Sequence, residues 1–394
     1  MTESSFLLVV FATALLIIPT FSLGKHSRPK LKSENKVAIF VFGDSVFDVG
    51  NNNYLNIGIE GKANFPPYGE TFFRQPTGRF CDGRTIPDYA ASYANIPYWK
   101  PFLDTSYQNF TNGANFASAG GTVIPGDNPI TLNFGTQVGY LQQVANLLNE
   151  TLGHTEAQKI LRNGIYFSSF GGVDYMYYTS ENENATESEQ LEFVTTVIGN
   201  FTYWIEEIYQ KGGRKFAFQN VGPLGCQPEM KQSYNLTGKE CYEFVQTLAT
   251  LHNNALSNMA IELERKLSGF TYLIFDFFTT LNDRIQDPAK YGFKESNIAC
   301  CGTGTNRGTG CGRTTAYELC SDPNEYVFFD GGHPTESCYS ELGELLWNGT
   351  SDVTWPLNMK QLYELEIYSA DDGHFIDHKV IASSLISHQD IASY

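Results

Sequence analysis

The chain has 394 residues, 42% of them hydrophobic, and a formal net charge of −17 at pH 7. The acidic excess argues against nucleic-acid binding and against electrostatic docking on anionic lipid, because both require a basic face. The length suits one large domain or two small ones, and the hydrophobic content supports a sizeable core.

The N-terminus is interpreted as a secretory signal peptide that spans residues 1–24. Residues 6–18 are apolar, and Pro19 and the small residues Ser22 and Gly24 follow them. This run is short for a membrane-spanning helix, and no later stretch is long and apolar enough to cross a membrane. The sequence therefore predicts a secreted, extracellular protein, with the vacuole and the endoplasmic reticulum as alternative destinations.

From residue 37 onward, apolar strand-like runs alternate with helical patterns. This alternation predicts a parallel sheet with helices on both faces, formed by a single α/β domain over residues 25–350. Residues 351–394 carry few clear signals and are predicted to form a C-terminal tail. Strands are expected at 37–42, 165–170, 215–221 and 272–277, and helices at 86–93, 137–148, 191–209, 241–267 and 335–347.

Cysteines and sequons agree with export. An even number of cysteines in an exported chain favours disulfides, and the eight are Cys81, Cys226, Cys241, Cys300, Cys301, Cys311, Cys320 and Cys338. Residues 300–320 hold four of them and could form a zinc site, but two adjacent cysteines are poor tetrahedral ligands, so no metal is expected. Six sequons predict a glycoprotein, at Asn109, Asn149, Asn184, Asn200, Asn235 and Asn348.

A serine follows the first predicted strand directly. Residues 39–53 read IFVFGDSVFDVGNNN, and Ser45 lies just past the apolar run. Hydrolytic α/β enzymes place a nucleophile there, because the side chain is exposed and nearby backbone N–H groups can face a developing anion. An ordinary Gly-Asp-Ser turn would give the same pattern, so the interpretation depends on finding a base and an acid elsewhere.

His333 is the best candidate for that base among the seven histidines. It lies in FFDGGHPTE, on a predicted loop between an apolar run and a helix. Asp330 precedes it by three residues, and on a tight loop its carboxylate can accept from one imidazole nitrogen and leave the other for Ser45. The alternative is a loop histidine that caps a helix. His154 and His252 lie in or beside predicted helices, where solvated or packed roles are expected.

With these residues identified, the chain resembles the plant GDSL esterase/lipase family of the SGNH-hydrolase superfamily. The resemblance covers roughly residues 37–347 in the family's order, and it implies a three-layer flavodoxin-like fold and ester hydrolysis without a cofactor. It also implies that Ser45 is the nucleophile, His333 the base and Asp330 its orienting carboxylate. The family blocks are FGDSVFDVGNNN at 42–53, GANFASAGG at 113–121, GGVD at 171–174 and DGGH at 330–333, supported by PPYGETFF at 66–73, PTGRFCDGRTIPD at 76–88, NVGPLGCQP at 220–228 and CCGTG at 300–304.

One oxyanion donor of the family is missing from this chain. The resemblance implies three donors: the N–H of Ser45, a backbone N–H of Ala119 or Gly120, and an asparagine side chain in the third block. Position 173 is valine, which has no hydrogen-bonding side chain. Losing one such donor costs roughly 10²–10³ in turnover. Asn112 and Asn115 are candidates to replace it.

The sequence therefore predicts a secreted serine esterase or lipase that acts on a small-molecule or lipid ester and is weakened by Val173. Two alternatives remain open. One is a catalytically impaired binding or accessory glycoprotein of the myrosinase-associated type, with a protein partner. The other is an acyltransferase, which would use the same three residues to pass the acyl group to an alcohol other than water.

Overall fold

The computed structural model describes residues 36–125, 131–313 and 316–367. They belong to one compact unit that begins at Lys36. The predicted signal peptide, residues 25–35 and the last part of the predicted tail lie outside the described residues, as do His26, His374, His378 and His388.

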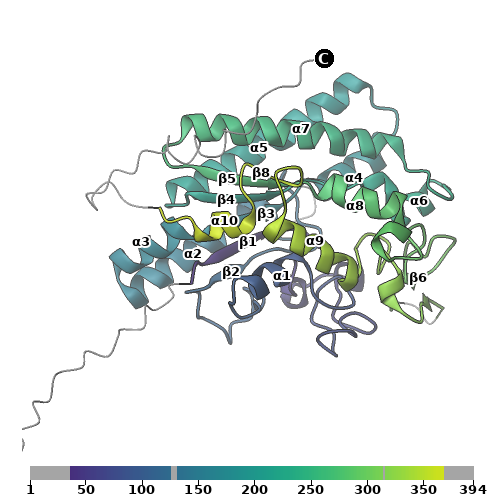
Figure 1. The fold of residues 1–394 in the computed structure, drawn as a ribbon, viewed down its shortest axis with the longest axis horizontal. Helices are drawn as coiled ribbons and strands as arrows, with labels where there is room; N and C mark the ends of the chain where they lie inside the picture. The colour runs from purple at the N-terminus through teal and green to yellow at the C-terminus, as the bar shows by residue number, and fades with distance from the viewer. Residues whose placement is uncertain (1–35, 126–130, 314–315, 368–394) are drawn as a thin grey trace, which may run out of the picture. The chain divides into compact units, whose positions relative to one another are not determined.

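A six-stranded sheet forms the centre of this unit (Figure 1). Its strand order is β2-β1-β3-β4-β5-β8; the first five strands run parallel and β8 is antiparallel to β5. The order 2-1-3-4-5 is that of the flavodoxin-like doubly wound fold, so the predicted α/β architecture is confirmed. The strands are β1 (Ile39–Gly43), β2 (Gly113–Asn115), β3 (Ile165–Ser169), β4 (Lys215–Gln219), β5 (Thr271–Phe275) and β8 (Thr354–Trp355).

Helices cover both faces of the sheet, and side chains of β1 alternate between the two resulting cores. Phe40 and Phe42 pack with α2, α5 and α7 on one face, whereas Ile39 and Val41 pack with α1, α8, α9 and α10 on the other. Because both faces are buried, β1 is a continuous apolar run instead of an alternating one. In Figure 1, α5 and α7 lie on one side of the sheet and α1 and α9 on the other.

The predicted helices are present, and several short ones are added to them. The added helices are α3, α4, α6, α8 and α10; α3 and α4 start beside Gly153 and Gly171, which read as breaks in the sequence. The helices are α1 (Ile86–Tyr93), α2 (Phe134–Leu152), α3 (His154–Asn163), α4 (Gly172–Glu181), α5 (Glu187–Gln210), α6 (Pro228–Ser233), α7 (Glu243–Lys266), α8 (Phe277–Gln286), α9 (Glu336–Asn348) and α10 (Met359–Glu364).

Part of the predicted C-terminal tail packs on the domain. β8 extends the sheet beside β5, and α10 buries Met359 and Leu362 in the same core as α9. The ammonium of Lys215, at the start of β4, donates to the carbonyl of Leu365 at 2.9 Å. The first residues after position 350 therefore contribute an edge strand and a helix. A two-residue strand is too short to show an apolar period in the sequence.

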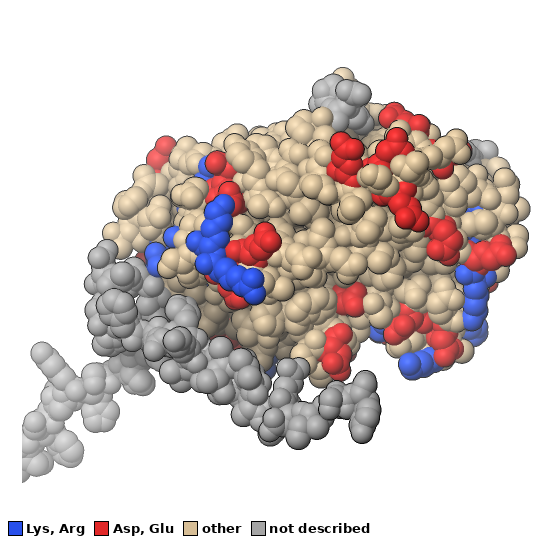
Figure 2. Space-filling view, turned by 90° about the horizontal axis from the view of Figure 1, so that it is seen from above, with Lys and Arg blue, Asp and Glu red and all other residues tan. Residues whose placement is uncertain are grey.

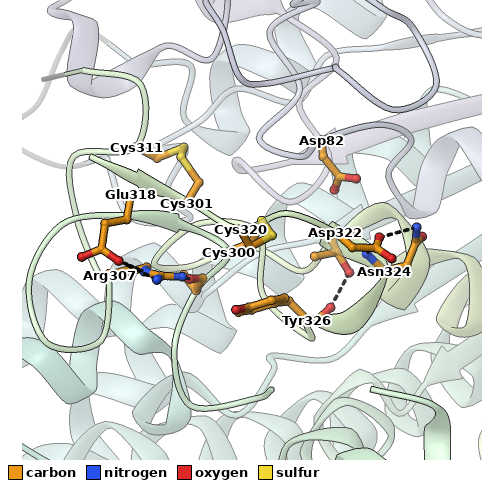
Figure 3. The surroundings of a disulfide bond; sticks show 12 residues. Asp82, Cys300, Cys301, Arg307, Cys311, Glu318, Cys320, Asp322, Asn324 and Tyr326 are labelled. Carbon is orange, nitrogen blue, oxygen red and sulfur yellow. Dashed lines mark hydrogen bonds and ion pairs between the residues drawn. A yellow bond between two sulfur atoms is a disulfide. The ribbon is translucent and has the colours of Figure 1, made fainter. Parts of the chain in front are cut away.

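Six of the eight cysteines form disulfides. The pairs are Cys226–Cys241, Cys300–Cys320 and Cys301–Cys311. The last two lie in the glycine-rich loop that also holds the short strands β6 (Cys301–Gly302) and β7 (Glu318–Leu319), and they exclude zinc ligation there because the four sulfurs are bonded to one another (Figure 3). Cys81 and Cys338 are free and buried, so the even count overestimates the disulfides.

The surface agrees with the acidic composition. Acidic side chains are scattered across the face drawn in Figure 2, and basic side chains lie among them singly or in small groups. Among the residues that the structure describes, no helix combines the length and the apolar character that a membrane span needs.

Candidate active site

Ser45 lies in the tight turn that follows β1. Gln137 fixes the backbone of Gly43: its side-chain oxygen accepts from Gly43 N–H at 2.9 Å, and its amide donates to Gly43 O at 2.8 Å. The N–H of Asp48 then donates to Asp44 O at 3.0 Å and closes the turn. The turn therefore presents a partly exposed Ser45 at the carboxyl edge of the parallel strands, where open α/β sheets bind ligands.

The structure brings together Ser45, His333 and Asp330. Ser45 and His333 are 288 residues apart in sequence, and Asp330 and His333 are three residues apart. Nε2 of His333 lies 2.7 Å from Ser45 Oγ, and Nδ1 lies 2.7 Å from Asp330 Oδ1. An ionised carboxylate can only accept, so Nδ1 carries the proton toward Asp330 and Nε2 is left to accept from the serine hydroxyl. Only 15% of the His333 side chain and 9% of the Asp330 side chain are exposed. This is the arrangement that acyl transfer by serine requires.

The Asp330 carboxylate is held from two sides. Its Oδ1 also accepts from the N–H groups of Gly332 and His333, at 3.0 and 2.9 Å. Its Oδ2 accepts from the hydroxyl of Tyr68 at 2.9 Å, and Tyr68 is fully buried. The N–H of Phe329 donates to His333 O at 2.8 Å and closes the loop. Both carboxylate oxygens have partners, so the direction in which Asp330 holds the imidazole is fixed.

Burial and charge have opposite effects on the pKa values of Asp330 and His333. Burial favours the neutral form of each group, but their mutual attraction and hydrogen bond outweigh it, so the pKa of Asp330 is lowered and the pKa of His333 is raised above 6.5. The charges of Asp44 and Glu229 add to the raised pKa of His333. Burial in turn raises the pKa of Asp44 to about 6. The site therefore stabilises the imidazolium that forms when His333 takes the Ser45 proton.

Two backbone N–H groups beside Ser45 are available to an anion. Within the described residues, neither Ser45 N–H nor Gly120 N–H has an acceptor. The N–H of Ala119 donates to Asp48 Oδ2 at 3.0 Å, which leaves Gly120 of the two candidates in the second block. Gly120 adopts φ +79°, a left-handed conformation that glycine adopts without a steric cost, and it lines a cavity together with Ser45.

Val173 lies at the position where the family pattern has asparagine. It is half-buried in the first turn of α4 and lines a cavity with Ser45 and His333. Asn115 does not replace the missing donor, because it is fully buried, donates to Phe47 O at 2.9 Å and lines neither cavity at Ser45. Asn112 does not replace it either: its carbonyl accepts from Ile39 at the amino end of β1, and Ser45 follows the carboxyl end.

Two cavities meet at Ser45 and His333. The smaller, about 310 Å³, has largely apolar walls that include Val46, Phe170, Val173, Met176, Leu224 and Phe277. The larger, about 540 Å³, is lined by glycines and by polar side chains that include Glu60, Thr131, Thr309 and Arg313. Tyr177, Glu229 and Gly332 line both cavities. An ester bound at Ser45 can therefore place its two halves in chemically different surroundings.

Buried polar side chains join the first family block to the second, a role that the sequence reasoning missed. Asp48 accepts from Gly50 N–H at 2.7 Å as well as from Ala119 N–H. The amide of Asn51 donates to Ala117 O at 2.8 Å, and the amide of Asn52 donates to Ala119 O at 2.9 Å. Buried polar groups need partners, so the Asp and Asn residues within an otherwise apolar block were the available signal.

The remaining described histidines are not part of the site. His252 is buried in α7 with Nδ1 2.7 Å from the Tyr175 hydroxyl, and burial lowers the pKa of His252 to about 3. His154 is exposed at the start of α3. Both fit the packed and solvated roles expected from their places in the sequence.

Comparison with known proteins identifies the family to which the chain belongs. A family model described as GDSL-like Lipase/Acylhydrolase matches residues 39–346. A GDSL lipase of Tanacetum cinerariifolium is 41% identical over 361 residues, covering 91% of this chain and 94% of the relative. GDSL esterase/lipase 2 of Arabidopsis thaliana is 40% identical over 371 residues, covering 92% and 98%. Inactive GDSL esterase/lipase-like protein 25 of Arabidopsis thaliana is 38% identical over 329 residues, covering 84% and 75%. The chain therefore belongs to the GDSL-like lipase/acylhydrolase family.

Proposed function

We propose that the protein is a serine carboxylic-ester hydrolase in which Ser45 is the nucleophile, His333 the general base and Asp330 the orienting carboxylate. The observation that carries this proposal is the unbroken chain of contacts from Ser45 Oγ through His333 to Asp330, with both nitrogen–oxygen distances at 2.7 Å. Membership of a family of lipases and acylhydrolases supports the same reaction class.

The reaction follows from this geometry. Ser45 Oγ attacks the ester carbonyl carbon while its proton moves to His333 Nε2, and ionised Asp330 stabilises the imidazolium. The carbonyl oxygen becomes an anion and accepts from the N–H groups of Ser45 and Gly120. The imidazolium then gives its proton to the leaving alcohol, which leaves an acyl group on Ser45. Water that is deprotonated by His333 releases the acid and restores the enzyme.

The cavities suggest how the ester binds. The smaller cavity has apolar walls beside Ser45, so we assign it to the acyl chain. The larger cavity offers hydroxyl and charged groups, so we assign it to the alcohol. A substrate with an apolar acyl group on a polar alcohol fits both surfaces. Small-molecule esters and lipid esters belong to this class.

We also propose that the protein is secreted and glycosylated. Three disulfides support an oxidising compartment. Asn109, Asn149, Asn184, Asn235 and Asn348 are exposed, and Asn200 is half-buried on α5. Treatment of the purified natural protein with a glycosidase, followed by mass spectrometry, tests the sequons. A mature N-terminus at Met1 would contradict signal cleavage.

The catalytic proposal is tested with Ser45→Ala. Wild-type protein should hydrolyse p-nitrophenyl butyrate and should react with a fluorophosphonate probe, and Ser45→Ala should lose both activities. Ser233→Ala is the matched control, because Ser233 is exposed at the end of α6 and should leave both unchanged. Equal hydrolysis by wild type and Ser45→Ala would overturn the proposal.

A second candidate is a non-catalytic binding or accessory protein with a protein partner. Two observations favour it: Val173 removes a donor, and one relative at 38% identity carries the description inactive. On this hypothesis Ser45 is not activated, so the wild-type protein would fail to react with the fluorophosphonate probe. Labelling of Ser45 in the wild type would exclude it.

A further inference from the structure

We propose that the hydroxyl of Tyr177 donates the oxyanion hydrogen bond that Val173 cannot supply. The inference rests on the proposed serine-hydrolase function and concerns the same site. Tyr177 would keep its proton throughout the reaction and would act only as a hydrogen-bond donor, as an asparagine amide does in such a site.

α4 begins beside the turn that holds Ser45. β1 and β3 are neighbours, and Gly43 at the end of β1 is paired with Ser169 at the end of β3. Both strands leave the sheet here: β1 leads into the turn with Ser45, and β3 leads into α4 at Gly172. A Cβ added to Gly172 would lie 3.8 Å from Asp44 Oδ2. The first turn of α4 therefore packs directly beside the nucleophile turn.

Val173 and Tyr177 are neighbours on the surface of α4. They are four residues apart on α4, so they lie on the same face of the helix, one turn from each other. Long helical side chains lean back toward the N-terminus, which directs the Tyr177 ring over the turn that holds Val173. Tyr177 lines both cavities, one with Ser45 and Val173 and the other with Ser45 and Gly120. Its phenol therefore borders the space into which the two free N–H groups can donate.

The Tyr177 hydroxyl is available to donate a hydrogen bond to a ligand. It has no hydrogen-bond partner among the residues that the structure describes, and 49% of the residue is exposed. Each of the three side-chain amides on the wall of the smaller cavity donates one hydrogen bond to the protein. Gln219 donates to Ser169 Oγ at 3.2 Å, Asn220 to Asp276 Oδ1 at 3.0 Å and Gln227 to Gly332 O at 3.1 Å.

A buried carboxylate holds the two sides of this space together. Asp174 follows Val173 directly, and it accepts from Val123 N–H at 3.0 Å and from Ile124 N–H at 3.0 Å. These contacts tie α4 to the segment that follows Gly120. A donor on α4 and the N–H of Gly120 are therefore fixed relative to each other, which a preorganised anion site requires.

The experiment is a double-mutant cycle with Tyr177→Phe and Val173→Asn, measured as kcat and KM for p-nitrophenyl butyrate and as the rate of Ser45 phosphonylation by a fluorophosphonate. Tyr177→Phe alone should lower kcat by about 10²-fold with little change in KM, because the hydrogen bond forms only with the anion. In the Val173→Asn background the same substitution should have little effect, because the amide supplies the bond. The double variant should therefore approach the wild-type rate.

The matched control is Tyr178→Phe. Tyr178 is the next residue on α4, but its ring stacks on Phe193 of α5 at a centroid distance of 4.1 Å and it lines neither cavity, so the rate should not change. A wild-type rate for Tyr177→Phe, or an equal loss in both backgrounds, would overturn the inference. Failure of the proposed function is distinguishable, because hydrolysis would then also survive Ser45→Ala.

Discussion

The two sides of Ser45 are built in different ways. On the His333 side, every polar atom of the Asp330 carboxylate and of the imidazole ring has a partner within 3.0 Å. On the α4 side, Val173 contributes only methyl groups, and within the described residues two N–H groups and the Tyr177 hydroxyl have no hydrogen-bond partner.

This difference follows from burial. Asp330 and His333 are largely buried, so a change at either leaves the other as an unpaired polar group, which costs stability as well as activity. Val173 is half-buried at a cavity wall, where an apolar side chain replaces an amide without leaving a buried partner unsatisfied. The anion side can therefore lose a donor while the fold and the proton-transfer side stay intact.

The largest expected effect comes from breaking the His333 side with Asp330→Asn. The amide can donate to Nδ1 and so favours the tautomer whose Nε2 carries the proton, which then cannot accept from Ser45. We expect kcat for p-nitrophenyl butyrate to fall by about 10⁴-fold. Asp322→Asn is the control, because Asp322 caps the 3-10 turn at Pro323–Glu325, just past the last cysteine of the disulfide-bonded loop (Figure 3). A loss below tenfold in a variant with an unchanged thermal unfolding curve would contradict the role of Asp330.

A smaller effect is expected from Tyr68→Phe, which removes the donor to Asp330 Oδ2. Hydrogen bonds to charged groups contribute about 1.5–3 kcal/mol, and part of that loss should appear as a fall of about tenfold in kcat with KM unchanged. A carboxylate without this donor attracts the imidazole proton more strongly, so the acid limb of kcat should move to higher pH. A KM effect without a kcat effect would argue against a positioning role.

Tyr339→Phe is the matched control for that substitution. Tyr339 is as buried as Tyr68, but its hydroxyl has no hydrogen-bond partner among the described residues. Its removal should therefore leave kcat, KM and the acid limb unchanged. If both variants lost activity equally, the effect of Tyr68 would belong to aromatic packing and not to its hydrogen bond.

Local sequence patterns were enough to predict part of the site. Ser45 follows a continuous apolar strand, and Asp330 and His333 share one short loop, so their types and spacing were readable. Tyr68 was not, because its partner is 262 residues away and an aromatic residue in a loop has no signature of its own. The choice between Ala119 and Gly120 depended on Asp48 accepting from one of them, which is a tertiary contact.

The fold also has features that local sequence predicts and features that depend on tertiary contacts. The four predicted strands appear because burial on both faces makes them mostly apolar, without an alternation of apolar and polar residues. α4 was missed because it starts with two glycines, Gly171 and Gly172, and has no N-cap side chain that would mark the beginning of a helix. Of the eight cysteines, Cys81 and Cys338 stay unpaired in the interior, and no count of cysteines distinguishes them from the paired ones.

The smallest expected effect is a shift in pH dependence on replacing Glu229 with Gln. His333 must be neutral to accept the Ser45 proton, so kcat/KM should fall as the pH drops through the raised pKa of His333, above 6.5. Glu229 borders both cavities and is one of the carboxylates, with Asp330 and Asp44, whose charge raises that pKa. Glu229→Gln removes one negative charge and should move the acid limb to lower pH by less than a unit, with the plateau rate unchanged.

Glu60→Gln separates this local effect from a general loss of negative charge. Glu60 lines the larger cavity but is exposed, and it is not among the groups that raise the pKa of His333. The acid limb of kcat/KM for Glu60→Gln should therefore stay at the wild-type pH. An equal shift in both variants would mean that the long-range field of an acidic protein sets the pH of the acid limb. A plateau loss in Glu229→Gln would instead place Glu229 in contact with the substrate. A shift confined to Glu229→Gln, at constant plateau, is the result expected if the His333 side is tuned by its immediate carboxylates, and added salt should then reduce it only weakly because the groups are partly buried.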